Sequence, residues 1–542
     1  MKNYLDYPGE LYLFFKEVFI LIQPYYWNIW FLSSIIFMLF YLYQLQKQTH
    51  SFFYFLSLFV GLLFFRLPSF MQYSYNPDES EFLSSINLLS NNIHYWKVTD
   101  TYTSGPLNSI PFVLFSAIGI KWNYFSFRLI NVCFIQFPTL VLSYYTLKHF
   151  FNNNQTKSVI FPIVLFYTFL STNELVMYTS EQIPNLLLVL SVYCFTKYYF
   201  NNKIYLLFFS VFVLGFVPLA KFQYLLLVGF TMATYLFILL KNKLIKQTIC
   251  IALIFIIPTL LTIFIVIYNH SFQDAYISYI KMNFIIAKQG LGYNIPFPNS
   301  LLNVFYLLRV NIEFKILFVA LFILLIYHVL LNKNKIFLPS NIAVAILFFF
   351  ILAYFTVIKT GNLFYHYLFI FICPILAIYV YLYYVNLDNK NFVKLYCILP
   401  FLLFIYSNYQ NKYFIDDVYK KINNIYLPAS EIINTLEKTN NKIAVWGWNT
   451  KLYMETNSIQ ATRDPHIFNQ VYESKYNEFF LRRYLLDIEK NKPALFIDAV
   501  PGFYFKDLKY RHENYRDINL YINKNYEKIV MVDSIRIYRI KN

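Results

Sequence analysis

The stretch from Arg66 to Glu81 reads Arg66-Leu-Pro-Ser-Phe-Met-Gln-Tyr-Ser-Tyr-Asn-Pro-Asp-Glu-Ser-Glu81. It leads from the end of an apolar block into the first long polar loop, and it carries the acidic pair Asp78-Glu79. Carboxylates beside a membrane span are costly to desolvate, so they are rare and are usually kept for function. The stretch therefore predicts a membrane protein with chemistry at one face of the bilayer.

The composition agrees with this interpretation. Of 542 residues, 58% are hydrophobic and 13% are charged, and the mean hydropathy is +0.46. A soluble domain carries about 25% charged residues. The apolar residues form blocks of about 15–22, the length of a helix that crosses a bilayer, so we predict a polytopic α-helical membrane protein with about 12 transmembrane helices. The spans are expected at 27–45, 52–66, 125–147, 158–172, 183–200, 204–219, 223–240, 248–268, 314–331, 342–358, 363–384 and 394–408.

The net charge of +17 sets the orientation of the chain in the membrane. Lysines gather in every second loop between the apolar blocks, and acids gather in the alternate loops. Positive loops stay on the cytoplasmic side, so the acidic loops are expected to be extracytoplasmic. Because the charge is explained by topology, we predict no nucleic-acid partner. The lysines concerned are Lys47, Lys148, Lys157, Lys197, Lys203, Lys241, Lys243, Lys246, Lys333, Lys335, Lys390 and Lys394.

Three regions are expected along the chain. Residues 1–26 form an N-terminal interfacial segment, because their apolar run is short and broken by Lys16-Glu17. Residues 27–408 form the transmembrane domain, with 67–124 as its first extracytoplasmic loop. Residues 409–542 form an extracytoplasmic α/β domain, large enough to hold a core of its own.

The patterning of the tail predicts its elements. Residues 442–448 and 493–500 are typical of buried strands, 467–490 of a helix, and 526–540 of a hairpin. Two polar turns in the tail, Ala461–His466 and Phe496–Gly502, could bind an acceptor, although ordinary strand ends have the same composition.

Asp78-Glu79 has two interpretations. A carboxylate at the membrane surface can act as a general base, or it can bind a divalent metal that neutralises a phosphate. The same residues could instead begin a helix, with Asn76 or Asp78 as its N-cap, Pro77 beside it and acids in the first turn. The two interpretations are compatible.

Other ionisable residues fall on the same predicted face. Lys221 could meet a lipid-linked phosphate or simply extend to the interface. Glu181 could face a cavity as a second acid, or complement the start of its own helix. His366, beside Tyr367, could donate to a phosphate oxygen or be a hydrogen-bonded packing residue. Glu174, Arg128 and Arg66 are weaker candidates, Arg66 being explained equally well as an interface anchor.

The ordered set of motifs resembles the GT-C class of integral-membrane glycosyltransferases. It is most similar to the bacterial branch with the protein mannosyltransferase-like and lipid A aminoarabinose transferase-like enzymes. The resemblance covers roughly residues 50–385, and the extra apolar segment at 27–45 departs from the commonest arrangement. Its motifs are Arg66-Leu-Pro before Asp78-Glu79, Gly105-Pro-Leu, Phe127-Arg-Leu129, Tyr178 to Glu181, Leu219-Ala-Lys221 and Phe364-Tyr-His-Tyr to Pro374, with Val445-Trp-Gly-Trp448 and Ala461-Thr-Arg-Asp464 in the tail.

The resemblance implies a function and roles for these residues. It implies a polyprenyl-phosphate-sugar donor that enters from the membrane, an extracytoplasmic glycan, lipid or protein acceptor, and inversion at the anomeric carbon. Asp78 would be the general base, with Glu79 supporting it or binding metal. Lys221, His366, Tyr367, Glu181 and Arg128 would contact substrate. No cofactor is predicted with certainty, and a divalent metal held by Asp78 and Glu79 stays open. The location implied is the bacterial cytoplasmic membrane.

Two alternatives use the same lipid-linked saccharides. A transporter or flippase would be expected to carry ionisable residues near the middle of the bilayer and internal symmetry. A ligase or polymerase would be expected to depend on Arg and His in a large late loop. In this chain the acids gather at one interface, and the loop at 269–313 offers mainly Lys281, Lys288, His270 and Arg309.

Overall fold

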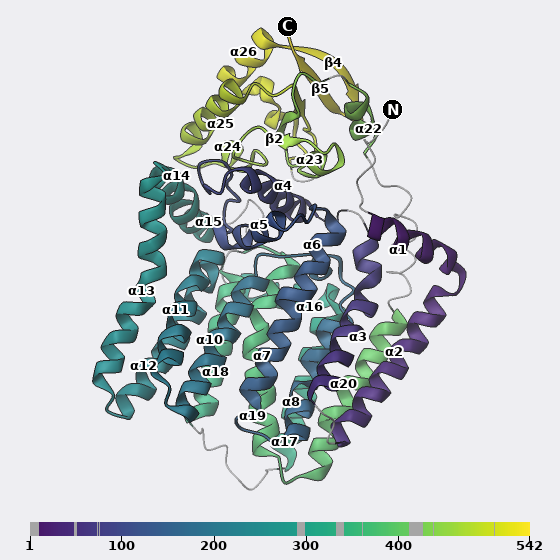
Figure 1. Cartoon of the computed structure of the whole chain (residues 1–542), viewed down its shortest axis with the longest axis vertical. Coiled ribbons are helices and arrows are strands. Elements are labelled where there is room, and N and C mark those ends of the chain that lie inside the picture. Colours follow the sequence, from purple (N-terminus) through teal and green to yellow (C-terminus); the bar gives the residue numbers. More distant parts are fainter. Residues whose placement is uncertain are drawn as a thin grey trace.

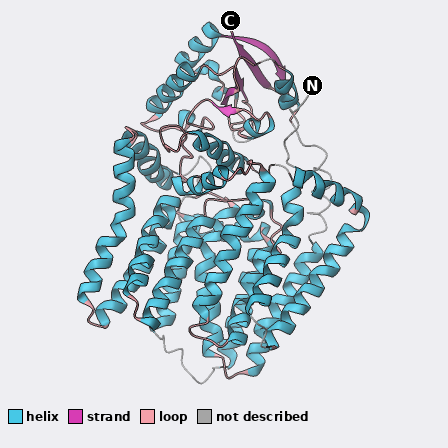
Figure 2. Ribbon diagram, in the orientation of Figure 1, coloured by secondary structure: helices cyan, strands magenta, loops and turns pink. Residues whose placement is uncertain are grey.

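A computed structural model describes residues 10–47, 51–72, 74, 76–289, 299–331, 341–359, 361–410, 427–436, 438–502 and 505–541. The chain forms a bundle of long helices with a cap at one end, and a small mixed domain lies on that cap (Figure 1). All the strands that the structure describes belong to this outer domain (Figure 2).

The expected spans coincide with helices of the bundle. Within the described residues, ten helices are long and apolar enough to cross a membrane, including Tyr25–Gln46, which coincides with the span expected at 27–45. Two more expected spans fall on α8 and α11, which have 16 and 17 residues. The prediction of a polytopic helical membrane protein is confirmed. The bundle contains α2 (Gln23–Gln46), α3 (Ser51–Met71), α6 (Tyr124–Asn131), η2 (Val132–Gln136), α7 (Phe137–Leu147), α8 (Asn153–Thr168), α10 (Gln182–Asn201), α11 (Ile204–Ala220), η3 (Phe222–Tyr224), α12 (Leu225–Lys241), α13 (Ile245–Tyr268), α17 (Ile312–Leu331), α18 (Asn341–Ile358), η6 (Tyr365–Phe371), α19 (Ile372–Val385) and α20 (Lys390–Gln410).

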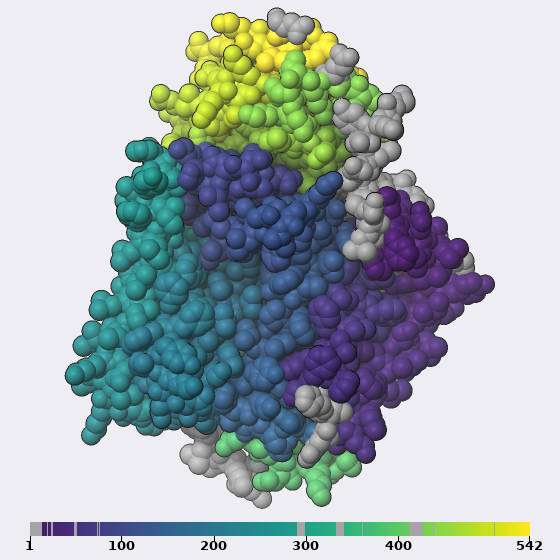
Figure 3. Space-filling view, viewed as in Figure 1, coloured from purple at the N-terminus to yellow at the C-terminus, as the bar shows by residue number. Residues whose placement is uncertain are grey.

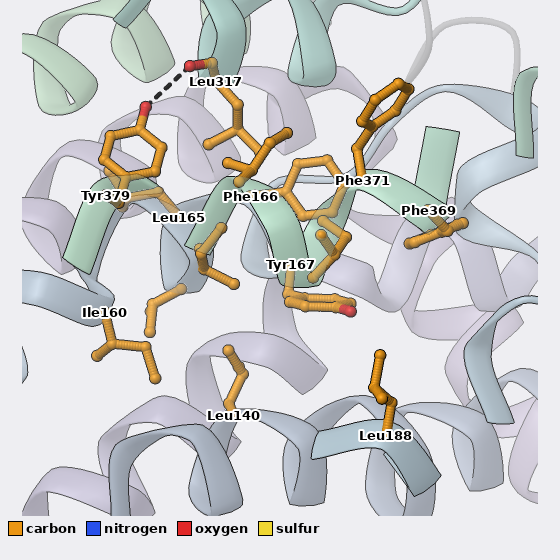
Figure 4. Close-up of a cluster of buried hydrophobic side chains, with 14 of the residues drawn as sticks. Leu140, Ile160, Leu165, Phe166, Tyr167, Leu188, Leu317, Phe369, Phe371 and Tyr379 are labelled. Carbon is orange, nitrogen blue, oxygen red and sulfur yellow. Dashed lines mark hydrogen bonds between the residues drawn. The ribbon is translucent and has the colours of Figure 1, made fainter. Parts of the chain in front are cut away.

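Aromatic side chains fill the centre of the bundle (Figure 4). Phe166 packs on Phe369, with ring centroids 6.1 Å apart. The Tyr379 hydroxyl donates to the carbonyl of Leu317 at 2.8 Å, which satisfies a polar group that lipid could not. Many of the chain's numerous Phe and Tyr residues therefore serve the packing of the core.

The cap consists of the two long loops. The first contributes α4 (Pro77–Asn91), η1 (Pro106–Asn108) and α5 (Ile110–Ala117), so its apolar second half forms a short helix on the cap, as expected (Figure 1). The second contributes five short helices, and its Gly/Pro-rich turn at 290–298 lies outside the described residues. These are α14 (Phe272–Ala275), η4 (Tyr276–Lys281), α15 (Met282–Gln289), η5 (Asn299–Leu302) and α16 (Asn303–Val310). At the N-terminal end, α1 (Glu10–Leu21) is a separate helix beside the cap.

The outer domain is a five-stranded sheet in the order β2-β1-β3-β5-β4. The first three strands are parallel, with Ile443 opposite Leu495, and β5 and β4 form the predicted antiparallel hairpin. The strands are β1 (Lys442–Trp446), β2 (Ile459–Gln460), β3 (Leu495–Asp498), β4 (Tyr526–Val532) and β5 (Ile535–Ile540). The helices are α22 (Pro428–Thr435), α23 (Lys451–Glu455), α24 (Phe468–Val471), α25 (Asn477–Asn491), η7 (Leu508–Tyr510), η8 (His512–Asn514) and α26 (Arg516–Asn525).

The helix predicted at 467–490 is two helices, α24 and α25. Asn477 explains the break, because its side-chain amide donates to the carbonyl of Tyr472 at 2.6 Å and its carbonyl accepts from the backbone N–H of Ser474 at 2.7 Å. Such side-chain bonds compete with the helical ladder and end α24.

The outer domain lies directly on the cap (Figure 3), and polar contacts hold it there. Thr450 donates to the carbonyl of Pro77 at 2.7 Å, at the first turn of α4. Arg483 is buried and reaches Asp100 of the first loop at 3.0 Å and Asp274 of α14 at 3.2 Å. Because a buried guanidinium needs carboxylate partners, these pairs join the domain to both loops. The domain therefore lies at the same end of the bundle as Asp78, as the count of spans predicts.

Candidate functional site

A cavity of about 110 Å³ lies where the bundle, the first loop and the outer domain meet. Of the sequence-predicted candidates, Asp78, Glu174, Lys221, His366 and Tyr367 line it together. Glu181 lies behind Lys221, and Glu79 and Arg128 are not among the lining residues. The lining residues are Asn76, Asp78, Glu81, Phe82, Thr101, Tyr102, Thr103, Ser104, Glu174, Met177, Thr179, Ser180, Lys221, Ile286, Phe364, His366, Tyr367, Trp448, His466 and Phe468.

Asp78 is placed in this cavity by the start of α4. Asn76 is the N-cap, its side-chain oxygen accepting from the backbone N–H of Asp78 at 2.6 Å, and Pro77 follows it, so the predicted helix start is confirmed. Burial raises the pKa of Asp78 from 3.8 to about 6 against the opposing effect of His366, and the neighbouring carboxylates Glu81 and Glu174 raise it further. A carboxylate with this pKa is suited to take and return a proton near neutral pH.

Glu79 points away from the cavity into an ion pair with Arg128. The Arg128 Nε donates to Glu79 Oε1 at 2.8 Å, and a second N–H reaches the other oxygen, so the contact is bidentate. Arg128 also donates to the backbone carbonyls of Ser69, at 2.7 Å, and Gln72, at the end of α3. Both side chains are fully buried. The pair ties α3, α4 and α6 together beside Asp78.

Lys221 is placed by a close approach of two backbones. It lies in extended conformation between α11 and η3, and it pairs with Ser104 of the first loop as an isolated β-bridge. Gly105 donates its N–H to the carbonyl of Ala220 at 2.8 Å. A Cβ on Gly105 would lie 1.8 Å from the carbonyl oxygen of Leu219, so only glycine allows this contact.

The Lys221 ammonium faces both polar and aromatic groups. It donates to the Ser180 hydroxyl at 2.7 Å, lies 3.3 Å from Glu181 Oε1, and lies 5.7 Å from the centroid of the Tyr367 ring. Although burial alone would raise it, the pKa of Glu181 is lowered, because Lys221 and His366 favour its charged form. Glu181 therefore supports Lys221 as a buried cation.

His366 is oriented by Glu174. The two form a contact of 3.1 Å between His366 Nδ1 and Glu174 Oε2, and the same oxygen accepts from the backbone N–H of Tyr365 at 3.1 Å. Glu313 holds the loop before Glu174, because its carboxylate accepts from both the backbone and the side chain of Ser171 and of Thr172. These contacts fix the imidazole at the cavity wall.

The opposite wall combines Glu81 and Tyr102, which the sequence did not single out, with Trp448 and His466, which belong to tail motifs named above. Glu81 Oε2 lies 3.1 Å from His466 Nε2, and the His466 ring lies between Tyr102 and Trp448, with centroids 4.3 Å and 4.1 Å away. Burial lowers the pKa of His466 to about 3 and raises the pKa of Glu81 well above its ordinary value. One signal was available: Asp78 and Glu81 are three residues apart, which places them on one face of a helix, whereas Asp78 and Glu79 diverge.

Asp78 and Glu79 have different surroundings, so the structure does not bring the two carboxylates together at the cavity. Both oxygens of Glu79 are occupied by Arg128, and only Asp78 of the two lines the cavity. Among the residues that the structure describes, no group of three or more His, Cys, Asp or Glu side chains is arranged to hold a metal ion.

Comparison with known proteins shows which fold this chain shares. No protein-family model and no curated protein matches the chain. Among solved structures, the chain matches ArnT from Cupriavidus metallidurans, crystallised bound to undecaprenyl phosphate, over 91% of this chain and 98% of ArnT. The TM-score is 0.55 and the sequence identity is 10%. The chain has a GT-C-like fold. This confirms the resemblance at the level of fold, and the ArnT-like architecture includes the outer domain because nearly the whole of both chains is aligned.

The Glu79–Arg128 pair yields a stability prediction. Replacing either partner alone leaves the other charge buried without compensation, which costs about 3–5 kcal/mol. We expect Glu79→Met and Arg128→Met each to lower the midpoint of thermal unfolding in detergent strongly, and the double variant to lose less than the two single losses combined. Arg539→Met, which breaks an exposed pair with Glu527, should change little. Additive losses in the double variant would show that the two side chains are not coupled.

Proposed function

We propose that this protein is a membrane glycosyltransferase that moves a sugar from a polyprenyl-phosphate donor to a hydroxyl of an extracytoplasmic acceptor. The observation that carries the proposal is the shared cavity: Asp78, a carboxylate with a pKa near 6, lies with the cation Lys221 and with His366 at one end of a membrane bundle. The GT-C-like fold supports it, as does the undecaprenyl phosphate bound to ArnT.

The donor phosphate fits the side of the cavity that holds Lys221 and His366. Of the described lining residues, Lys221 is the only lysine or arginine. An adjoining apolar cavity of about 210 Å³ shares Thr103, Ile286 and Tyr367 with the first, and Lys359 lies on its wall. We assign this second cavity to the start of the polyprenyl chain, because its lining surface is mostly apolar and it adjoins the first cavity at Tyr367, beside Lys221.

The reaction follows from these placements. The acceptor hydroxyl oxygen attacks the anomeric carbon, its proton passes to Asp78, and the bond from that carbon to the phosphate oxygen breaks with inversion. Lys221 and His366 stabilise the charge that develops on the departing polyprenyl phosphate. Glu181 and Glu174 orient these two donors, and Tyr367 closes the wall beside Lys221. Glu79 and Arg128 act as positioning residues for the turn that carries Asp78.

The proposed function also implies a membrane, an orientation and an acceptor for this protein. We place the bundle in the bacterial cytoplasmic membrane with the outer domain outside the cell, because the lysine-rich loops lie at the opposite end of the bundle from Asp78. The acceptor would be a glycan, a lipid or a protein of the envelope. The cap and the outer domain cover the cavity, which limits transfer of the sugar to water.

The base is tested by Asp78→Asn. Asparagine keeps the size of the side chain but cannot take a proton, so transfer from synthetic polyprenyl-phosphate sugars should fall by roughly 10²-fold or more. The control is Asp533→Asn, at an exposed hairpin turn where asparagine accepts the positive φ of 47°. Donor binding should survive in both variants. Unchanged transfer by Asp78→Asn would contradict the role of Asp78 as the base. If the wild-type protein moves lipid-linked sugar across liposomes without any transfer, it is a transporter.

The raised pKa of Asp78 sets the pH profile. A general base must be ionised, so the rate of single-turnover transfer should fall as the pH is lowered through about 6, where Asp78 becomes protonated. An unperturbed aspartate would keep its activity down to a pH near 4. Rates measured between pH 4.5 and 8 with saturating donor test this. A profile that is flat across this range, or that rises on acidification, would contradict the assignment.

A further inference from the structure

The outer domain contributes a wall of the cavity. Its residues Trp448, His466 and Phe468 line the cavity alongside Tyr102 of the first loop. Trp448 and His466 follow β1 and β2, so they lie beyond the carboxyl ends of two parallel strands. In open α/β sheets this edge is where ligands bind. Here that edge is turned toward the membrane domain, with Trp448 half-buried at the cavity.

The wall is held rigidly. The imidazole of His466 is stacked on both faces, at 17° to the Tyr102 ring and 20° to the Trp448 ring. His466 Nδ1 accepts from the backbone N–H of Phe468 at 3.2 Å, so the ring proton is on Nε2 and is donated to Glu81. Tyr102 has a positive φ of 54° and its hydroxyl donates to the carbonyl of His466. A bulky residue in this conformation is uncommon and persists where its surroundings fix it.

The wall also differs in charge from the rest of the cavity. Lys221 and His366 form the cationic side. On the side of Trp448 and Tyr102, the described lining residues include no lysine or arginine, and burial keeps His466 neutral. An anionic group placed against this wall would be desolvated without a counter-charge, which is unfavourable. A ligand with apolar C–H faces and uncharged hydroxyls suits an aromatic surface with a carboxyl beside it.

We propose that Trp448, His466 and Tyr102, with Glu81, form the acceptor subsite, and that this subsite takes an uncharged sugar ring. This inference rests on the proposed function, because it divides the cavity between donor and acceptor. Trp448 and Tyr102 are specificity-determining residues: the aromatic surface lies along the ring, and the Glu81 carboxyl bonds to its hydroxyls. Asp78, one helical turn before Glu81 on α4, then lies beside the hydroxyl that reacts.

The test compares two sets of ligands on the wild-type protein in lipid nanodiscs saturated with undecaprenyl phosphate, which occupies Lys221 and His366 and so keeps a phosphate probe from binding there. Methyl pyranosides of glucose, galactose and mannose are the uncharged probes, and the same sugars with a 6-phosphate are the anionic probes. Saturation-transfer NMR measures binding without turnover. We expect the uncharged probes to bind and the phosphates to bind at least about tenfold more weakly. Equal or tighter binding of the phosphates, or no binding of any uncharged probe, would overturn the proposal. This comparison does not depend on the folding of a variant.

Substitutions at Trp448 and Lys221 then show which side of the cavity binds the uncharged sugar. Trp448→Ala should weaken binding of the uncharged probe about tenfold, whereas Trp448→Tyr, which keeps an aromatic face, should retain most of it. Lys221→Met should bind the probe normally and lose undecaprenyl phosphate. Wild-type binding by Trp448→Ala would contradict the proposal.

The two proposals fail in different ways. Sugar binding that depends on Trp448, without any transfer from a lipid-linked donor, would contradict the proposed transferase activity but support the sugar subsite. Normal transfer by Trp448→Ala with an unchanged KM for the acceptor would contradict the subsite but support the transferase activity.

Discussion

The buried ion pair between Glu79 and Arg128 is the interaction on which the site depends. Arg128 holds the end of α3 through two backbone carbonyls and holds the start of α4 through Glu79. The neighbouring residue, Asp78, is thereby fixed at the cavity. A buried pair of this kind contributes little net stability, but losing one partner is costly. The pair therefore fixes the geometry of the site. Within the acidic dipeptide, Glu79 positions the start of α4 and Asp78 faces the cavity.

Other ionisable side chains around the cavity are also held in pairs. Three pairs of ionisable groups lie there: Lys221 with Glu181, His366 with Glu174, and Glu81 with His466. Pairing lets ionisable groups remain at the end of an apolar bundle. The outer domain completes the arrangement, because Arg483 joins it to Asp100 and Asp274 of the two cap loops. Without that docking, the wall of Trp448 and His466 would not reach the cavity.

Local sequence pattern was sufficient for the bundle, the hairpin and the start of α4, because each depends on hydrophobic runs or on capping within a few residues. Together with the family resemblance it proposed Asp78, Lys221, His366 and Tyr367 as candidates, and the structure brings these four to one cavity. It was not sufficient to separate Glu79 from Asp78, because the partner of Glu79 lies 49 residues away. It marked the turn Ala461–His466 as one that could bind an acceptor, but it did not connect His466 with Glu81, because that contact spans 385 residues and exists only once the outer domain has docked.

The most direct test of this assignment of the cavity is a cryo-EM structure of the protein in nanodiscs with undecaprenyl phosphate. We expect the phosphate at Lys221 and His366, with Lys221 Nζ about 2.7–2.9 Å from a phosphate oxygen, and the lipid chain running past Tyr367 into the adjoining apolar cavity. A phosphate bound away from the cavity of Asp78, or against the wall of Trp448 and His466, would contradict it.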